Sequence, residues 1–432
     1  MGLRMRRITI SFLICMLLIA SLTPIVESVT KTKETIYNSN IEFDLNTFNG
    51  YAEKPIWNVG DKWEYYFSFN VNMNEEGTNS EIDLSIDNIE LVIEEETEDT
   101  YNLTVDGDIV GYFSFKATGV PRIRGSLQNT IMNGYLIVDK DFSIKNASLY
   151  IDGTLKVSIV PVTIDIDLNV TCNPPITLID FPLYVGKEWL TNPSIVNIFG
   201  VINLPGLKNI PGMPEDVPDK FPIEETIDNE MTEVSCTDFE NISIQSLGKY
   251  EAYKIESINK TNYYSPVLGN FIEIVSPPNN YTTVEFYLHS TNYTVPGAPN
   301  IPRKPEGINK GKPVTAFEYS TSTIDNENDD IYYLFDWDDG SNSGWLGPYP
   351  SGETINKSHT WSKKGSYSVS VKAKDTEDHE SRWSEILYVS MPKVKQYNLL
   401  QKLFDFLYEH FSIIKQFFSN VQYFLEEFFL QE

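Results

Sequence analysis

Apolar and polar residues alternate along most of residues 40–295, the period of β-strands with one buried face. One row of apolar residues on a single strand face comprises Val162, Ile164, Ile166, Leu168, Val170 and Cys172. Apolar residues occupy the even positions 82, 84 and 86 and then the odd positions 89, 91 and 93. This change of phase predicts a bulge or bend at Asp87-Asn88. No convincing helical period interrupts this region. We therefore expect a large antiparallel β-domain over residues 29–295, as a curved sheet, half-barrel or sandwich.

Turn residues punctuate these strands. Asp106-Gly107 and Asp152-Gly153 each follow an alternating stretch, and Asp-Gly pairs are typical of hairpin turns, so we expect hairpins to turn at both pairs. Five prolines between residues 205 and 222 predict an extended surface loop. A curved antiparallel sheet of this size is either filled by its own side chains or encloses an apolar groove for a lipid or peptide.

A second group of short alternating strands occupies residues 313–391. The apolar rows are Phe317/Tyr319, Tyr333/Phe335/Trp337 and Tyr367/Val369/Val371/Ala373. Several such strands in about 80 residues predict an immunoglobulin-like sandwich of two sheets. Tyr367, close after Gly365, is expected to act as the corner tyrosine of such a fold.

This second region also resembles the PKD domain. The matching residues are Phe335-Asp336-Trp337, Asp339-Gly340, Ser358-His359-Thr360-Trp361, and Gly365-x-Tyr367-x-Val369-x-Val371 followed by Asp375. Asp338 stands where the family usually has glycine, so we expect an aspartate in a left-handed turn there. The resemblance covers residues 296–391 and is to the form found in secreted archaeal proteins. It implies a spacer or binding module and names no reaction.

Residues 392–432 change from a period of two to a heptad pattern. The seam comprises Leu400, Phe404, Leu407, Phe411, Ile414, Phe418, Val421, Leu425 and Phe428, which predicts an amphipathic helix that needs apolar cover. Three kinds of cover are open: self-association as a helical bundle, a membrane surface, or docking on the β-domain or another surface protein. We expect residues 397–430 to mediate membrane association or self-association.

The first 28 residues have the features of a secretory signal peptide. Arg4, Arg6 and Arg7 precede an apolar stretch from Ile8 to Ala20, and cleavage after Ser28 is expected. An uncleaved N-terminal anchor is the alternative. Either way, we expect a secreted or cell-surface protein, with membrane association as one form of the latter.

The overall charge narrows the set of partners. Sixty-one Asp and Glu residues against 33 Lys and Arg give a formal net charge of -28. This charge repels nucleic acids and anionic lipid headgroups and excludes both as primary partners. Only four His residues occur, which argues against histidine-based zinc or acid–base sites. Other surface proteins and glycans remain as the expected partners.

Two cysteines follow the signal segment. Cys172 and Cys236 both lie in the apolar phase of their strands, so in an oxidising exterior we predict a disulfide worth about 4 kcal/mol. Two buried free thiols are the alternative. Eight Asn-x-Ser/Thr sequons predict a glycoprotein. They are Asn102, Asn146, Asn169, Asn241, Asn259, Asn280, Asn292 and Asn356.

Two clusters in the second region are candidate binding sites. Asp325, Glu327, Asp329 and Asp330 crowd oxygen ligands into one turn, which makes calcium the candidate cofactor, with solvated turn acids as the alternative. Trp345, Tyr349 and Trp361 are the candidate aromatic patch for glycan stacking. Packing of the Gly-Pro loop onto the sandwich is the alternative for these three side chains.

Motifs that identify an enzyme do not occur in the sequence. There is no nucleophile elbow, His-Glu-x-x-His pair, Walker loop or dinucleotide fingerprint. So many acidic residues make carboxylate pairs inevitable, and a pair is therefore no sign of a glycosidase. We expect an exported, non-catalytic surface protein with an adhesion, envelope-structural or ligand-binding role. The alternatives are a secreted hydrolase with a PKD accessory module, and a lipid- or peptide-carrying half-barrel.

Overall fold

A computed structural model describes residues 51–75, 78–117, 122–210, 216–258, 260–275 and 282–391. The predicted signal segment, the sequons at Asn259 and Asn280, and the predicted helical tail lie outside these residues. Within them the chain is almost entirely β-structure, as the alternating pattern predicts. No helix in the described part of the chain is long and apolar enough to cross a membrane.

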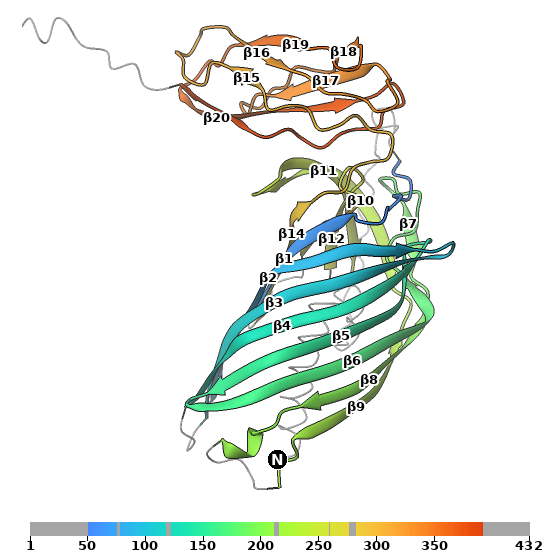
Figure 1. The fold of residues 1–432 in the computed structure, drawn as a ribbon, viewed down its shortest axis with the longest axis vertical. Helices are drawn as coiled ribbons and strands as arrows, with labels where there is room; N and C mark the ends of the chain where they lie inside the picture. The colour runs from blue at the N-terminus through green and yellow to red at the C-terminus, as the bar shows by residue number, and fades with distance from the viewer. Residues whose placement is uncertain are drawn as a thin grey trace, which may run out of the picture.

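The β-domain is one antiparallel sheet of 14 strands, in the order β7-β10-β11-β12-β13-β14-β1-β2-β3-β4-β5-β6-β8-β9 (Figure 1). Its strands are β1 (Lys62–Glu75), β2 (Thr78–Glu96), β3 (Thr100–Ala117), β4 (Ile123–Asp139), β5 (Ser143–Val157), β6 (Val160–Thr177), β7 (Glu188–Leu190), β8 (Ser194–Asn203), β9 (Lys220–Asn229), β10 (Glu233–Ile244), β11 (Gly248–Ser257), β12 (Lys260–Ser265), β13 (Asn270–Val275) and β14 (Thr282–Thr291). A single 3-10 turn, η1 (Leu207–Asn209), follows β8 in the proline-rich connection. Strands β2 to β6 have 15 to 19 residues each, about three times the usual strand length.

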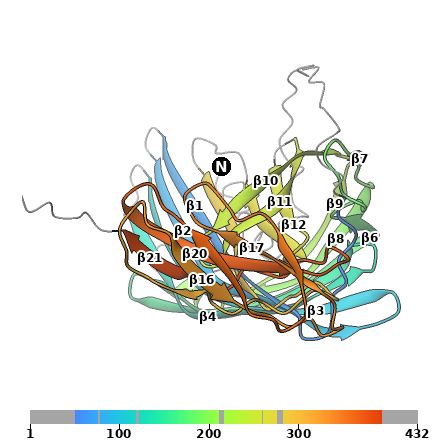
Figure 2. The same ribbon diagram turned by 90° about the horizontal axis from the view of Figure 1, so that it is seen from above.

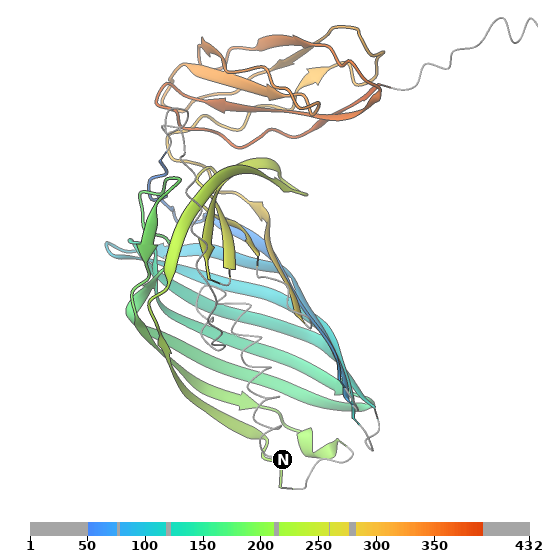
Figure 3. The same cartoon turned by 180° about the vertical axis from the view of Figure 1, so that it is seen from behind.

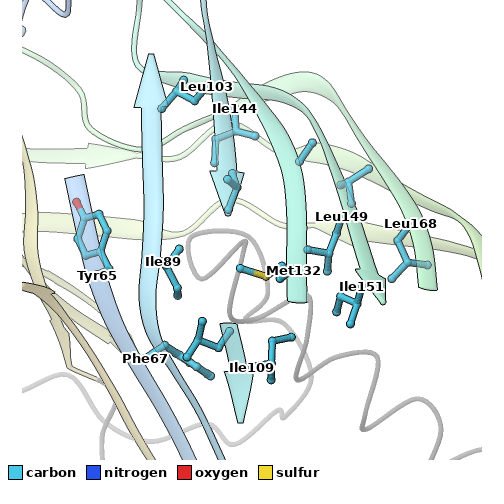
Figure 4. Packing of buried hydrophobic residues seen from close by; sticks show 14 of the residues in the cluster. Tyr65, Phe67, Ile89, Leu103, Ile109, Met132, Ile144, Leu149, Ile151 and Leu168 are labelled. Carbon is cyan, nitrogen blue, oxygen red and sulfur yellow. The ribbon is translucent and has the colours of Figure 1, made fainter. Parts of the chain in front are cut away.

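Alternation assigns the two faces of this sheet. In β6 the side chains of Val162, Ile164, Ile166, Leu168, Val170 and Cys172 are buried, as the sequence pattern predicts. The intervening Asp165, Asp167 and Asn169 lie on the opposite face. Strand register carries the apolar phase across the sheet. One row joins Trp63, Leu91, Val105, Gly134, Leu149, Leu168 and Gly200. We call the face with the buried rows the inner face and the other the outer face (Figure 4).

The sheet is rolled into a trough with the inner face on its concave side (Figure 3). Rolling brings neighbouring backbones close together at inner-face glycines. A Cβ atom at Gly134 would collide with the carbonyl oxygen of Ser148 on β5, and one at Gly200 with that of Asp167 on β6. Glycine at these positions therefore permits the curvature, because a side chain would force adjacent strands apart.

The two hairpins predicted at Asp-Gly pairs are wrong. Asp106-Gly107 lies inside β3 and Asp152-Gly153 inside β5, and both strands continue straight through. Both glycines face inward, where a Cβ at Gly107 would lie 2.9 Å from Ile86 Cγ2. They accommodate tight packing on the concave side and do not form turns. The bend predicted at Asp87-Asn88 is confirmed, because the β2–β3 register shifts between Ile86 and Glu90.

The second unit, which we call the sandwich (residues 296–391), packs two small sheets together. They are β15-β16-β19 and β18-β17-β20-β21, and Figure 1 places them across one end of the β-domain. The strands are β15 (Glu306–Gly307), β16 (Phe317–Thr321), β17 (Ile331–Asp336), β18 (Leu346–Tyr349), β19 (Ile355–His359), β20 (Gly365–Lys374) and β21 (Leu387–Met391). All three predicted apolar rows enter one core, which contains Tyr319, Trp337, Trp361 and Val371.

Two local predictions for the sandwich are confirmed. Asp338 has a φ of 57°, the left-handed conformation expected where the family has glycine, and its carboxylate accepts a hydrogen bond from Ser368 N at 3.0 Å. Tyr367 donates its hydroxyl to the carbonyl oxygen of Lys363 at 2.9 Å, which is the corner-tyrosine contact.

The sandwich lies over the β-domain in the view of Figure 2, and the segment before β21 makes the contact between them. Arg382 Nη1 donates to the carbonyl oxygen of Thr291 at the end of β14. Trp383 packs against the core of the β-domain. Ion pairs flank this contact, with Lys372 Nζ 3.6 Å from Glu251 Oε2 and Lys249 Nζ 3.8 Å from Asp338 Oδ1. Buried contacts at the centre and ion pairs outside them join the two units.

Candidate functional site

The inner face of the β-domain is an extended apolar wall. The inward positions over residues 147–157 of β5, 160–172 of β6 and 196–202 of β8 are all aliphatic, glycine or cysteine. Figure 4 shows Met132, Leu149, Ile151 and Leu168 projecting from successive strands to the same side of the sheet. Strands of 15 to 18 residues make the wall about 50–60 Å long. Such a surface offers burial to hydrocarbon and almost no hydrogen bonds.

One end of this wall is built from aromatic side chains, Trp57, Trp63 and Tyr65. Their polar atoms already form hydrogen bonds within the protein, so this end also offers an apolar surface. Trp57 Nε1 donates to Gly269 O at 2.9 Å and Trp63 Nε1 to Leu268 O at 2.7 Å. Tyr65 donates its hydroxyl to Phe271 O at 2.9 Å, and burial raises its pKa far above the ordinary value. These three side chains therefore present only ring carbons to the inner face.

The inner-face side chains of β2 to β6 are almost fully buried, in one apolar cluster that also contains Tyr250 and Ala252 of β11 and Leu288 of β14. A sheet with one apolar face is stable only when something covers that face. The inner face thus forms the largest apolar cluster in the described chain, and its side chains are shielded from water in the folded protein.

A second feature is a pocket of about 880 Å³ on the outer face, near the ends of β2 to β5. It is lined by Glu81, Tyr112, Phe113, Ser114, Arg122, Arg124, Gly125, Ser126, Gln128, Lys156 and Ser158. Strand register brings these residues together, with Ser114 opposite Arg124 and Ser126 opposite Lys156. Three cationic side chains and one carboxylate thus line a single pocket in a strongly acidic chain.

The cations of this pocket differ from most others in the β-domain. Arg124 and Lys156 form no ion pair with any described acidic residue, and Arg122 donates instead to the hydroxyl of Ser114 at 3.1 Å. In contrast, Lys54 pairs with Asp141 at 3.1 Å and Lys254 with Glu256 at 2.9 Å. The pocket therefore retains unneutralised positive charge.

The predicted calcium site is not formed by its four carboxylates. Asp325 is buried, and its Oδ1 accepts a hydrogen bond from Asp329 N at 3.0 Å, which holds the turn. Glu327 and Asp330 point to solvent. Among the described residues, no three His, Cys, Asp or Glu side chains converge on one point. Asp325 Oδ2 is buried without a hydrogen-bond partner in the described structure, and calcium binding stays a prediction.

The predicted aromatic patch is also wrong as a set. Trp361 is fully buried and donates Nε1 to Trp337 O at 3.0 Å, so it belongs to the core. Tyr349 packs against the same core beside Tyr333. Trp345 is half-buried, with Lys374 Nζ 4.9 Å from its ring centroid. The three side chains pack the loop onto the sandwich, which was the alternative interpretation.

The predicted disulfide is absent. Cys172 and Cys236 are both free and buried, as the alternative held. Cys172 lies in the inner-face cluster, whereas Cys236 packs with Trp189, Tyr253 and Ile255 in a separate cluster. Burial raises the pKa of Cys172 to about 11 and that of Cys236 to about 12. Both thiols therefore stay protonated at neutral pH and are poor nucleophiles.

Six of the eight sequons lie in the described chain. Asn102 of β3, Asn146 of β5 and Asn169 of β6 share the outer face of the sheet, where Asn169 occupies the polar phase as predicted. Asn241, Asn292 and Asn356 are exposed. Asn292 already uses its amide, accepting from Lys62 N at 2.6 Å and donating to Gly60 O at 2.9 Å. Glycosylation stays a prediction for all eight sites.

Sequence reasoning missed the cationic pocket. The only local signal is Arg122-Ile123-Arg124, two cations at the spacing of one strand face in an acidic chain. Lys156 lies 32 positions further along and reaches the pocket only through the β4–β5 register. The apolar wall, in contrast, follows directly from the alternation.

Comparison with protein families matches residues 300–388 to the PKD domain. A solved structure, the PKD domain of an M14-like peptidase from Thermoplasmatales archaeon SCGC AB-540-F20, is 46% identical over 22% of this chain and 97% of its own length, with a TM-score of 0.21. No curated protein matches the chain. The matched range coincides with the two-sheet sandwich described above. Residues 300–388 of this chain are therefore a PKD domain.

Proposed function

We propose that this is an exported, non-catalytic surface protein whose β-domain holds an elongated apolar ligand, such as an acyl or isoprenoid chain, against its inner face. The observation that carries the proposal is the continuous hydrocarbon wall across β5, β6 and β8, which forms one apolar cluster with the rest of the inner face. An extracellular location is supported by the PKD domain, an adhesion-type module of extracellular proteins, and by the predicted signal peptide.

The shape of the wall favours a chain-like ligand. Its strands run side by side for about 50 Å, so a flexible hydrocarbon chain gains contact along its whole length. Burial of each methylene group contributes about 0.8 kcal/mol, so a chain of 16 carbons gains on the order of 10 kcal/mol before ordering costs. Neither this wall nor the cationic pocket brings two carboxylates together, the arrangement used in glycoside hydrolysis.

Photolabelling the full chain with a diazirine-bearing fatty acid tests this function. Inner and outer positions alternate, so the labelled residue reports the face that the ligand contacts. We expect label on inner positions such as Leu149 and Leu168, and none on their neighbours Tyr150 and Asn169. Label confined to outer positions, or no labelling above that of sandwich peptides, contradicts the proposal.

A matched pair of variants sharpens the test. Leu149→Trp adds bulk to the inner wall, whereas Tyr150→Trp makes the same new side chain on the outer face one residue away. We expect the first variant to lose fatty-acid labelling and the second to retain it, with melting temperatures recorded for both. Equal labelling of the two variants would place the ligand away from this wall.

A further inference from the structure

The pocket of about 880 Å³ at the ends of β2 to β5 is a different surface from the apolar wall, because the charged and polar side chains that line it come from the outer face. Its size is that of a site for an organic ligand and exceeds what one inorganic ion fills. The lining combines cations with hydroxyl and amide groups on adjacent strands. This combination limits the chemistry of whatever binds there.

The cations define one part of the ligand. Arg124 and Lys156 extend from adjacent strands β4 and β5, are exposed, and have no described acidic partner. Arginine matches planar carboxylates and the oxygen atoms of sulfate or phosphate esters with paired N–H donors. The ligand therefore carries at least one anionic group. Because the chain as a whole repels anions, binding depends on these direct contacts and not on long-range attraction.

The remaining lining defines the other part. The ring of Tyr112 is 45% exposed at one wall, and its hydroxyl is fixed by donation to Glu81 Oε1 at 3.0 Å. The hydroxyl groups of Ser126 and Ser158 and the amide of Gln128 supply uncharged donors and acceptors around the cations. An exposed aromatic face beside many neutral polar groups suits a sugar ring, whose C–H face stacks on aromatics while its hydroxyls form hydrogen bonds.

We propose that this outer-face pocket, built on Arg122, Arg124, Lys156 and Tyr112, binds an acidic oligosaccharide bearing sulfate or uronic acid groups. The inference does not rest on the apolar-ligand function, since the two sites use opposite faces of the sheet. It gives the expected glycan partner a location in the β-domain, away from the aromatic residues of the sandwich.

Calorimetric titration of the full chain with a heparin hexasaccharide tests the proposal, with maltohexaose as the uncharged probe and sodium sulfate as the plain anion. We expect saturable binding of the sulfated hexasaccharide and none of maltohexaose. The double variant Arg124→Gln, Lys156→Gln should lose at least about tenfold in affinity, because two charged hydrogen-bonding groups are removed. Tyr112→Ala should weaken hexasaccharide binding and leave any sulfate binding unchanged.

The matched control is Lys145→Gln, Lys220→Gln, which makes the same change in net charge elsewhere in the β-domain and should change the affinity less than about twofold. All four replaced residues lie at or near the surface, so melting temperatures should stay close to that of the parent chain. The proposal is overturned if the hexasaccharide does not bind, or if the Arg124/Lys156 variant binds as well as the control. It is also overturned if sulfate at equal ionic strength displaces the hexasaccharide, since that identifies a plain anion site.

Discussion

The two units of this chain use the same alternating pattern and solve the burial problem differently. The sandwich closes two small sheets on each other, so that the aromatic side chains of Tyr319, Trp337 and Trp361 are enclosed in the core between the sheets. The β-domain has one sheet of 14 strands, whose inner-face residues form a single buried cluster. Two facing sheets thus enclose the core of the sandwich, whereas the apolar residues of the β-domain gather on the concave side of one rolled sheet.

The difference shows in how each unit uses its special residues. In the sandwich, Asp338 and Tyr367 fix turns and corners at the rim of a complete core. In the β-domain, Gly134 and Gly200 lie within long strands and permit curvature. Special residues thus terminate strands in the first unit and bend them in the second. The variants below test this contrast.

The largest effect is expected for Trp361→Ala in the sandwich. Trp361 is fully buried, its ring is 5.3 Å from that of Tyr367, and it donates to Trp337 O. Loss of the ring should lower the free energy of unfolding of the sandwich by about 3–5 kcal/mol. Calorimetry of the full chain should show this transition moving down while that of the β-domain changes little. An equal shift of both transitions would mean that the sandwich core is not self-contained.

A somewhat smaller effect is expected for Gly134→Ala in the β-domain. The new methyl group meets the backbone oxygen of Ser148, which adjacent strands cannot easily move, so we expect a loss of about 3 kcal/mol. Gly107→Ala is the comparison on the same face, where the new methyl group would lie 2.9 Å from Ile86 Cγ2 and 3.3 Å from Asn88 O, a milder clash that should cost less. Urea unfolding of both variants checks this ranking, and equal losses would contradict the role given to Gly134.

Alternation predicts much of this fold because it is a local property. The buried row of β6, the bend near Asp87 and the sandwich core all follow from the phase of neighbouring residues. The hairpins predicted at the Asp-Gly pairs were wrong because glycine is favoured both in a turn and at a position inside a rolled sheet where neighbouring strands leave no room for a Cβ atom. Whether Gly153 forms a turn or faces Thr130 depends on the strand beside it, which is not read from local sequence.

The sites show the same limit more strongly. The alternation of apolar and polar residues predicted that Cys172 and Cys236 are both buried, but it could not predict that they lie in different clusters. Four acids in one turn suggested calcium, yet Asp325 holds the loop. The apolar wall was predictable because every strand contributes the same chemistry. The cationic pocket was not, because it arises only when β4 and β5 bring distant residues together.

The contact between the two units should be weaker than either core. Arg382 is largely removed from water, burial lowers its pKa, and it donates to the backbone of Thr291. Arg382→Ala should remove about 1.5–3 kcal/mol of coupling, the usual contribution of a hydrogen bond to a charged group. We expect the two calorimetric transitions to separate further in this variant. Lys304→Ala, an exposed cation of the sandwich, is the control and should leave them unchanged. Identical traces for the two variants would show that Arg382 does not couple the units.

The smallest effect concerns the thiols, which occur only in the β-domain within residues 51–391. Burial raises the pKa of Cys172 to about 11 and that of Cys236 to about 12, so the folded protein keeps both protons where the unfolded chain, with thiol pKa values near 9.0, releases them. Unfolding therefore releases protons above pH 9, and the stability of the β-domain should fall as pH rises from about 9 towards 11. The expected loss by pH 10 is on the order of 1 kcal/mol per thiol.

A double variant separates the thiols from the tyrosines, because tyrosines with raised pKa values change stability in the same direction. The measurement compares how far the urea midpoint shifts between pH 8 and pH 10 in the parent chain and in the double variant Cys172→Ala, Cys236→Ala. The variant should lose less stability than the parent, while the sandwich transition should respond alike in both proteins. A parent and a variant with the same pH dependence would mean that the thiols are not buried as the two clusters require.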